Sequence, residues 1–131
     1  MKRLGLLLAM IFGLAAPAFA DPVEGIWKTK PGDDGNYGYI KISTCGANIC
    51  GVIYKAFNAS GKEIDSDNIG KKMIWGMAPQ GGGYYSGGKI WAPDRDKTYK
   101  SKMQLSGNSL EVSGCVLGGV ICRGQTWSRV K

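Results

Sequence analysis

Hydrophobic and polar residues alternate along several short segments of the chain, and turn-forming residues separate these segments. In one segment, Tyr99, Met103 and Leu105 fall on one face of an extended chain, whereas lysines and other polar residues fall on the opposite face. Ile40 and Ile42 follow the same period of two. This period is typical of β-strands with one buried side and one solvent-facing side. After residue 20, no segment keeps a helical period for more than one or two turns.

We therefore predict eight strands joined mostly by tight turns. They cover Val23–Thr29, Tyr37–Thr44, Ile49–Phe57, Lys72–Met77, Gly83–Trp91, Lys97–Ser106, Ser109–Val116 and Ile121–Val130. Gly107-Asn108 predicts a two-residue hairpin turn. The segment Ser60–Gly70 lacks a strand pattern, and we expect a helical turn within it. Eight short strands of this kind favour an all-β fold, an antiparallel up-and-down β-barrel, with a two-sheet β-sandwich as the alternative.

The first 20 residues have the pattern of a secretory signal. Lys2 and Arg3 precede an apolar stretch over Leu4–Ala16, and Ala18-Phe19-Ala20 provides a small-x-small cleavage site. The apolar stretch has 13 residues, fewer than the roughly 20 that a membrane-spanning helix needs. We expect cleavage after Ala20, a single domain over residues 21–131, and a periplasmic or secreted location with no membrane span.

Four cysteines form two closely spaced pairs, Cys45 with Cys50 and Cys115 with Cys122. Each pair encloses a short segment that contains glycine or asparagine, as a hairpin turn requires. Residues that face each other across antiparallel strands have a Cα separation suitable for a disulfide. In an oxidising compartment we therefore predict the bonds Cys45–Cys50 and Cys115–Cys122. Neither pair has the Cys-x-x-Cys spacing of a redox motif, so we interpret both as structural.

The composition argues against several classes of enzyme. The sequence contains no histidine, which excludes a histidine general base and imidazole metal ligands. Oxidised cysteines would provide neither thiolate nucleophiles nor zinc ligands. The acidic residues lie mostly in turn-rich segments, where aspartate is common for conformational reasons. We therefore expect no enzymatic activity, no metal and no cofactor, with a carboxylate-based hydrolase as the less favoured alternative.

The two ends of the expected domain resemble the ends of lipocalin-type barrels. Gly25-Ile26-Trp27 lies in the first predicted strand, and Gln125-Thr126-Trp127-Ser128-Arg129 lies in the last. In such barrels a glycine-x-tryptophan strand meets an arginine of the closing strand, and the guanidinium packs over the indole ring. The resemblance implies a lipocalin-like barrel in which Gly25, Trp27, Trp127 and Arg129, or Arg123 in place of Arg129, close one end.

Further motifs extend along the chain in a fixed order. They are Cys45-Gly46, Cys50-Gly51, Gly87-Gly88-Lys89-Ile90, Pro93, Lys97-Thr98-Tyr99, Gly114-Cys115 and the closing Gln125–Val130. This order is similar to that of the exported bacterial proteins of domain of unknown function 2147. The resemblance implies a periplasmic β-barrel-like domain, and it assigns no activity. The chain departs from the family pattern at Ala92-Pro93, where the family has Asp-Pro, and at Asp96-Lys97, where it has Gly-Lys.

Aromatic and basic residues gather in the middle strands and suggest a ligand site. The candidate ligand-binding residues are Trp75, Tyr85, Trp91, Arg95, Lys97, Tyr99 and Lys100. Aromatic rings at a barrel mouth can hold an apolar ligand, and the cations can bind an anionic headgroup. The same rings can instead fill a small barrel, because the interior of eight strands is just wide enough for side chains.

The net charge favours anionic partners. It is +7 for the whole sequence and falls to about +5 without Lys2 and Arg3. Our first hypothesis is a non-enzymatic periplasmic binding module for a small apolar or amphiphilic, anionic ligand such as a lipid. The alternative is an envelope interaction or stress protein with a filled barrel, which acts through its basic surface on protein, glycan or peptidoglycan. We expect no nucleic acid as partner.

Overall fold

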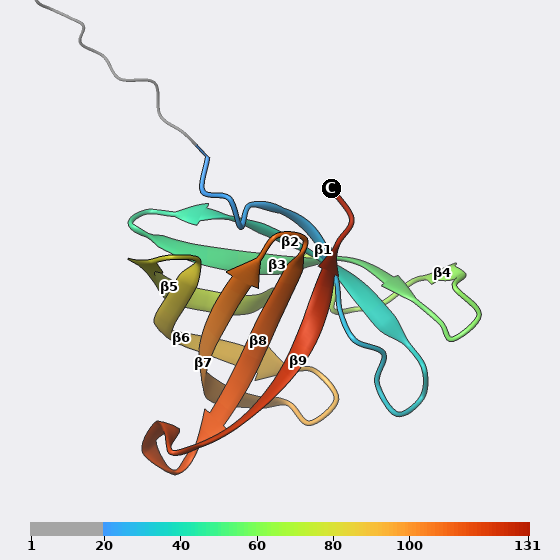
Figure 1. Ribbon diagram of the computed structural model, residues 1–131. Helices are drawn as coiled ribbons and strands as arrows, with labels where there is room; N and C mark the ends of the chain where they lie inside the picture. Colours follow the sequence, from blue (N-terminus) through green and yellow to red (C-terminus); the bar gives the residue numbers. More distant parts are fainter. Residues whose placement is uncertain (1–19) are drawn as a thin grey trace, which may run out of the picture.

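A computed structural model describes residues 20–131 and shows a closed β-barrel (Figure 1). Its elements are β1 (Gly25–Lys28), β2 (Tyr37–Cys45), β3 (Asn48–Phe57), β4 (Glu63–Ile64), β5 (Lys72–Gly81), β6 (Tyr84–Ala92), β7 (Lys97–Ser106), β8 (Ser109–Val116), the 3₁₀ turn η2 (Leu117–Gly119) and β9 (Ile121–Arg129). Apart from Ala20, the predicted signal peptide lies outside the described residues.

The strands follow an up-and-down order. β2 pairs with β3, β3 with β5, and each later strand pairs with the next through to β9, always antiparallel. β1 pairs with both β2 and β9, which closes a ring of eight strands, and the short β4 adds to the edge of β3. The predicted all-β barrel is confirmed, and the alternative sandwich is not observed.

The structure corrects the prediction for Ser60–Gly70. This segment contains the two-residue strand β4 and a turn over residues 67–70, where we expected a helical turn. The reason lies just before it, at Asn58, whose side-chain oxygen accepts hydrogen bonds from the amides of Ser60 and Lys62, both at 3.0 Å. The resulting turn directs the chain back along β3, where β4 pairs with Ala56 and Phe57.

Large apolar side chains fill one half of the barrel. Trp27 and Trp127 are fully buried and are joined by Ile42, Ile74 and Met77, together with further residues of the same cluster. Buried and exposed residues alternate around Ile42 on β2 and around Met103 on β7, as the sequence pattern predicted, whereas on β1 the neighbouring residues Ile26 and Trp27 are both buried.

The amino-terminal segment and Arg129 cover the packed end of the barrel. The indole nitrogen of Trp27 donates to the carbonyl of Val23 at 2.8 Å, and Val23 is itself fully buried. The Arg129 guanidinium lies over the Trp27 ring, 4.4 Å from its centroid. Of the two arginines that the sequence left open, Arg129 occupies this position, whereas Arg123 is exposed.

Both predicted disulfides are present. Cys115 and Cys122 face each other directly across β8 and β9, with a Cα–Cα distance of 4.0 Å. Cys45 and Cys50 are offset diagonally across the β2–β3 hairpin, because Cys45 faces Asn48, and their Cα atoms are 5.9 Å apart. Each bond therefore fixes one hairpin near its turn.

Candidate functional site

The end of the barrel opposite Arg129 is open and hollowed. Connections before β2, before β5 and before β7 meet there, and they surround a cavity of about 660 Å³. We call it the mouth cavity. Its apolar wall includes Ile40, Ile53 and Met73, which also pack against the core. Tyr37 and Phe57 add stacked rings whose centroids are 5.0 Å apart. Such a wall suits an apolar group of modest size.

The rim of the mouth cavity is more acidic than basic. Four aspartates line it, namely Asp33, Asp34, Asp65 and Asp94, against the two lysines Lys30 and Lys55. Lys55 lies 3.8 Å from the carboxylate of Glu63, which offsets part of its charge. Within residues 20–131, no three acidic or cysteine side chains gather closely enough to hold a metal ion. The rim therefore provides polar groups around an apolar wall, and its charge favours cations over anions.

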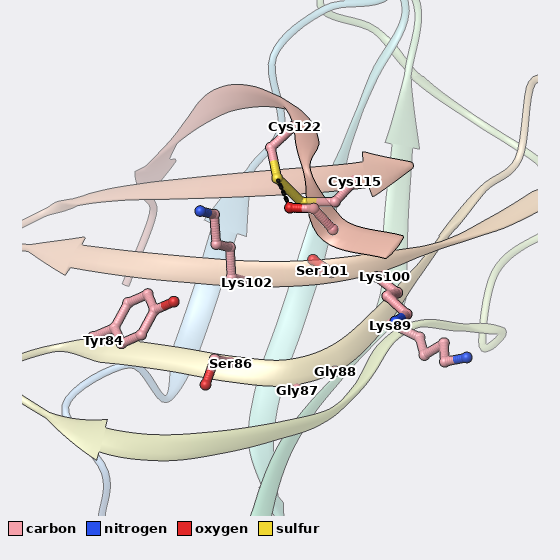
Figure 2. Close-up of a pocket in the computed structure, with 11 residues that line it drawn as sticks. Tyr84, Ser86, Gly87, Gly88, Lys89, Lys100, Ser101, Lys102, Cys115 and Cys122 are labelled. Carbon is pink, nitrogen blue, oxygen red and sulfur yellow. Dashed lines mark hydrogen bonds between the residues drawn. A yellow bond between two sulfur atoms is a disulfide. The ribbon is translucent and has the colours of Figure 1, made fainter. Parts of the chain in front are cut away.

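A second hollow of about 280 Å³ lies on the outside of the barrel, across β6, β7 and the β8–β9 tip (Figure 2). We call it the outer basic groove. Lys89, Lys100 and Lys102 line it, together with Tyr84 and the Cys115–Cys122 disulfide. Lys89 and Lys100 are partners across β6 and β7, and they lie side by side at one end of the groove (Figure 2). Among the residues that the structure describes, 20–131, no acidic side chain lines this hollow.

A backbone irregularity in β6 shapes this groove. The pairing of β6 with β7 shifts register between Tyr85 and Gly88, and Gly87 has a φ of 76°. A Cβ atom on Gly88 would lie 2.6 Å from the sulfur of Met77 and 2.6 Å from the carbonyl oxygen of Trp75. Gly88 therefore allows β5 and β6 to approach closely at the floor of the groove.

Comparison with known proteins agrees with this architecture. The family described as "Uncharacterized protein conserved in bacteria (DUF2147)" matches residues 25–129. The chain belongs to this family. Its fold is also similar to a solved structure described as protein HP1028 from the human pathogen Helicobacter pylori, which belongs to the lipocalin family. That match has a TM-score of 0.66 and 15% sequence identity, and it covers 83% of each chain. No curated protein gives a significant match. The predicted family and the lipocalin-like barrel are thus confirmed.

Two of the predicted ligand-binding residues point into the barrel without lining the mouth cavity. Tyr85 is buried, and its hydroxyl donates a hydrogen bond to the carboxylate of Asp21. Burial, followed by this hydrogen bond, raises the pKa of Tyr85 above its ordinary value. Tyr99 is half-buried, and the exposed Arg95 approaches its hydroxyl at 3.4 Å. Tyr85 therefore holds the amino-terminal segment against the barrel, and Tyr99 meets Arg95 near the open end.

The other predicted residues do not gather at one site, and Trp91 among them packs against the core. Trp75 is half-buried on β5, and Lys97 is exposed at the start of β7. Trp91 is half-buried and donates from its indole nitrogen to Asp96 at 2.9 Å. Asp96 has a positive φ of 49° in place of the glycine of the family pattern, and this hydrogen bond engages its side chain. Among the seven residues, only Lys100 lines one of the two hollows described above.

Apart from Lys100, the predicted site set did not include the residues that line the two hollows. The aspartates of the rim lie in segments that we interpreted as turns, and Ile40 and Ile53 carry the same alternating pattern as any core residue. Tyr84, Lys89 and Lys102 belong to the aromatic and basic residues that gather in the middle strands, but the sequence did not separate them from the other members of that group. The longer connections between strands are rich in polar residues and glycine, and such connections form the open end of a barrel. This concentration was a signal that could have located the mouth cavity.

Proposed function

We propose that the protein is a non-enzymatic binding module that takes the apolar part of a small molecule into its mouth cavity. The observation that carries this proposal is the cavity of about 660 Å³ at one end of a lipocalin-like barrel. Its volume falls in the usual range for small-molecule sites, about 300–1,000 Å³. The amino-terminal segment and Arg129 cover Trp27 at the opposite end, which supports entry of a ligand through the mouth.

The charge of the rim supports an amphiphile whose polar end is neutral or cationic. The sequence suggested an anionic headgroup held by Arg95, Lys97 and Lys100. Lys100 lies on the outer groove, away from the mouth, and Arg95 is 4.0 Å from the carboxylate of Asp94. Neither residue offers a free cation to the mouth cavity, which four aspartates line.

A displacement assay tests both the cavity and its charge preference. The neutral fluorescent probe N-phenyl-1-naphthylamine is bound to the protein, and decanol, decyltrimethylammonium and decanoate then compete with it below their micelle concentrations. We expect decanoate to compete least, because carboxylates line the rim. If decanoate instead competed most strongly of the three, the result would support the anionic preference predicted from the sequence.

Two variants place the probe in the cavity. Ala56 lines the cavity on β3, and A56W would fill part of it. Tyr54 on the same strand is exposed outside, so Y54W adds a tryptophan to the same strand without entering the cavity. We expect A56W to weaken probe binding at least about ten-fold and Y54W to leave it unchanged. M73Q, which makes the wall polar with little change in volume, checks the result if A56W folds poorly. Failure of the wild-type protein to bind any of these amphiphiles, or equal binding by A56W, would refute the proposal.

We also propose that the protein acts in the periplasm or outside the cell, after cleavage behind Ala20. The pattern of the first 20 residues and the two disulfides support this location. Amino-terminal sequencing of protein recovered from the periplasmic fraction tests it, with Asp21 as the expected first residue. Recovery of the uncleaved chain from the cytoplasm would contradict it.

A further inference from the structure

The tip of the β8–β9 hairpin exposes apolar side chains. Leu117 is 71% exposed and Val120 is 82% exposed, and Val116 and Ile121 beside them are also exposed. We call these four residues the apolar tip. The last residue pair between β7 and β8 is Lys100 with Cys115, so the tip extends beyond the pairing with β7. Figure 1 shows the hairpin reaching away from the rest of the barrel at this point.

The shape of the apolar tip is fixed by several local constraints. The Cys115–Cys122 disulfide joins its two strands immediately below it. Leu117 has a positive φ of 53°, which is unfavourable for a residue with a branched side chain. The turn is closed by a hydrogen bond from the amide of Val120 to the carbonyl of Leu117 at 3.3 Å. The disulfide and this backbone conformation thus hold two large apolar side chains in water, where packing gives them no stabilisation.

The outer basic groove adjoins the apolar tip on the same surface. Gly119 of the tip turn lines the groove together with Lys100, Lys102 and the disulfide, and Lys89 completes the group (Figure 2). Within residues 20–131, none of these three lysines has an acidic partner within 4.0 Å. Unpaired ammonium groups beside exposed apolar side chains form a surface that is complementary to an interface with both anionic and apolar layers.

We propose that this surface docks on an anionic lipid bilayer. The apolar tip inserts at the level of the headgroups, and Lys89, Lys100 and Lys102 bind lipid phosphates. Insertion would remove Leu117 and Val120 from water at a depth that an interfacial segment reaches, about 5–10 Å. No helix among the described residues has the length and apolarity to span a membrane, and docking of this kind requires none.

The charge distribution favours a bilayer over the other occupants of such a surface. Two copies of the chain that met face to face through the tip would bring three unpaired lysines against three others, which costs free energy. A soluble anion would use the lysines and leave the apolar tip in water. Only a partner with anionic groups above an apolar layer satisfies both parts at once. This inference is independent of the mouth cavity, because the tip residues do not line that cavity.

Co-sedimentation with vesicles tests the docking surface. The oxidised protein is mixed with phosphatidylcholine vesicles that contain about 30% phosphatidylglycerol, and with vesicles of phosphatidylcholine alone. We expect binding to the anionic vesicles, with partial release at about 0.5 M salt, because salt screens the lysines but not the apolar contact. Removal of one lysine should weaken binding about five-fold, and K89Q/K100Q/K102Q about 100-fold. L117S/V120S should weaken binding at least about ten-fold.

Matched variants separate the surface from general charge and apolarity. K41Q/K62Q/K72Q removes the same charge from exposed lysines outside the groove, and I69S/V130S removes two exposed apolar side chains elsewhere. We expect both variants to bind like the wild type, apart from a small general charge effect.

Four results would overturn the proposal. The first is no binding to anionic vesicles, and the second is equal weakening by the matched variants. The third is vesicle binding that L117S/V120S leaves unchanged, which would mean that charge alone holds the protein at the headgroups and that the apolar tip does not insert. A dimer that forms in solution without lipid and dissociates in L117S/V120S would assign the tip to self-association, and it would also refute the bilayer proposal.

Discussion

Replacing Arg129 with glutamine removes the cation that covers Trp27 at the packed end of the barrel. The guanidinium lies 4.4 Å from the centre of the indole ring. It also donates to the carbonyls of Glu24 at 3.0 Å and Pro22 at 2.6 Å, and to the side-chain oxygen of Asn108 at 3.1 Å. One side chain thus joins the amino-terminal segment, β1 and the β7–β8 turn. Glutamine is too short to reach all of these groups and carries no charge.

The magnitude follows from how exposed these contacts are. Hydrogen bonds from a charged donor contribute about 1.5–3 kcal/mol each, and a cation–π contact about 0.5–2 kcal/mol. Arg129 is only half-buried and two of its acceptors are at the surface, so water replaces part of each interaction. We therefore expect R129Q to lower the free energy of unfolding by about 2–3 kcal/mol. R129K keeps the charge without the planar donor geometry and should lose about half of that.

Equilibrium unfolding in urea measures this loss. Tryptophan fluorescence reports directly on the buried Trp27 and Trp127, and both disulfides stay oxidised throughout. For a domain of this size, about 2–3 kcal/mol shifts the midpoint by roughly 1.5–2 M urea. R123Q is the matched control, because Arg123 is exposed on the same strand and should change stability by less than about 0.5 kcal/mol. If R129Q were as stable as R123Q, the guanidinium would not be what holds this end closed.

Three further predictions concern other parts of the barrel. G88A should destabilise the fold by about 2–4 kcal/mol, because its Cβ would meet the Met77 sulfur and a backbone carbonyl at 2.6 Å; a change below about 1 kcal/mol in urea would contradict the close approach. Because the pKa of Tyr85 is raised in the folded protein, its protonated hydroxyl contributes fully to stability below about pH 10, and this contribution is lost as the pH rises above that value. Between about pH 9 and pH 11, Y85F should therefore lose less stability than the wild type. Parallel curves of unfolding free energy against pH for the two proteins would refute the assignment. Replacing Cys115 and Cys122 together with serine should lower stability by about 2.5 kcal/mol, which thermal unfolding would show as a lower Tm, and an unchanged Tm would contradict it.

The sequence pattern determined the strands well because each strand has one dry side. The alternation around Met103 and around Ile42 specifies which residues face the core, so β7 is predicted with its observed limits and β2 to within one residue. β4 could not be predicted in this way. It has two residues, too few for any period, and it forms because Asn58 turns the chain back onto β3.

The candidate site was much less predictable, for a geometric reason. Alternation along a strand predicts which way Trp75 and Tyr85 point only if the register is regular. The pairings of β5 and β6 contain register shifts next to glycines, and these shifts cannot be read from the alternation. Residue type alone did not separate the two roles open to the aromatic rings, which were to hold a ligand or to fill the barrel. Tyr85 binds Asp21 at the packed end of the barrel. The cavity wall instead uses aliphatic residues such as Ile53, which resemble core residues in the sequence.

The single join between β1 and β9 has a consequence for how the chain folds. Every other pairing in the barrel wall connects strands that are neighbours along the sequence, so hairpins can form as soon as their two strands are available. The join pairs Trp27 with Arg129 and Lys28 with Ser128, residues that are about 100 positions apart. We therefore expect closure to be the last and slowest step, since it has the largest loop to restrict. A chain that emerges amino terminus first would remain an open sheet with two unpaired edges until β9 arrives. During that interval it would be at its most vulnerable to aggregation.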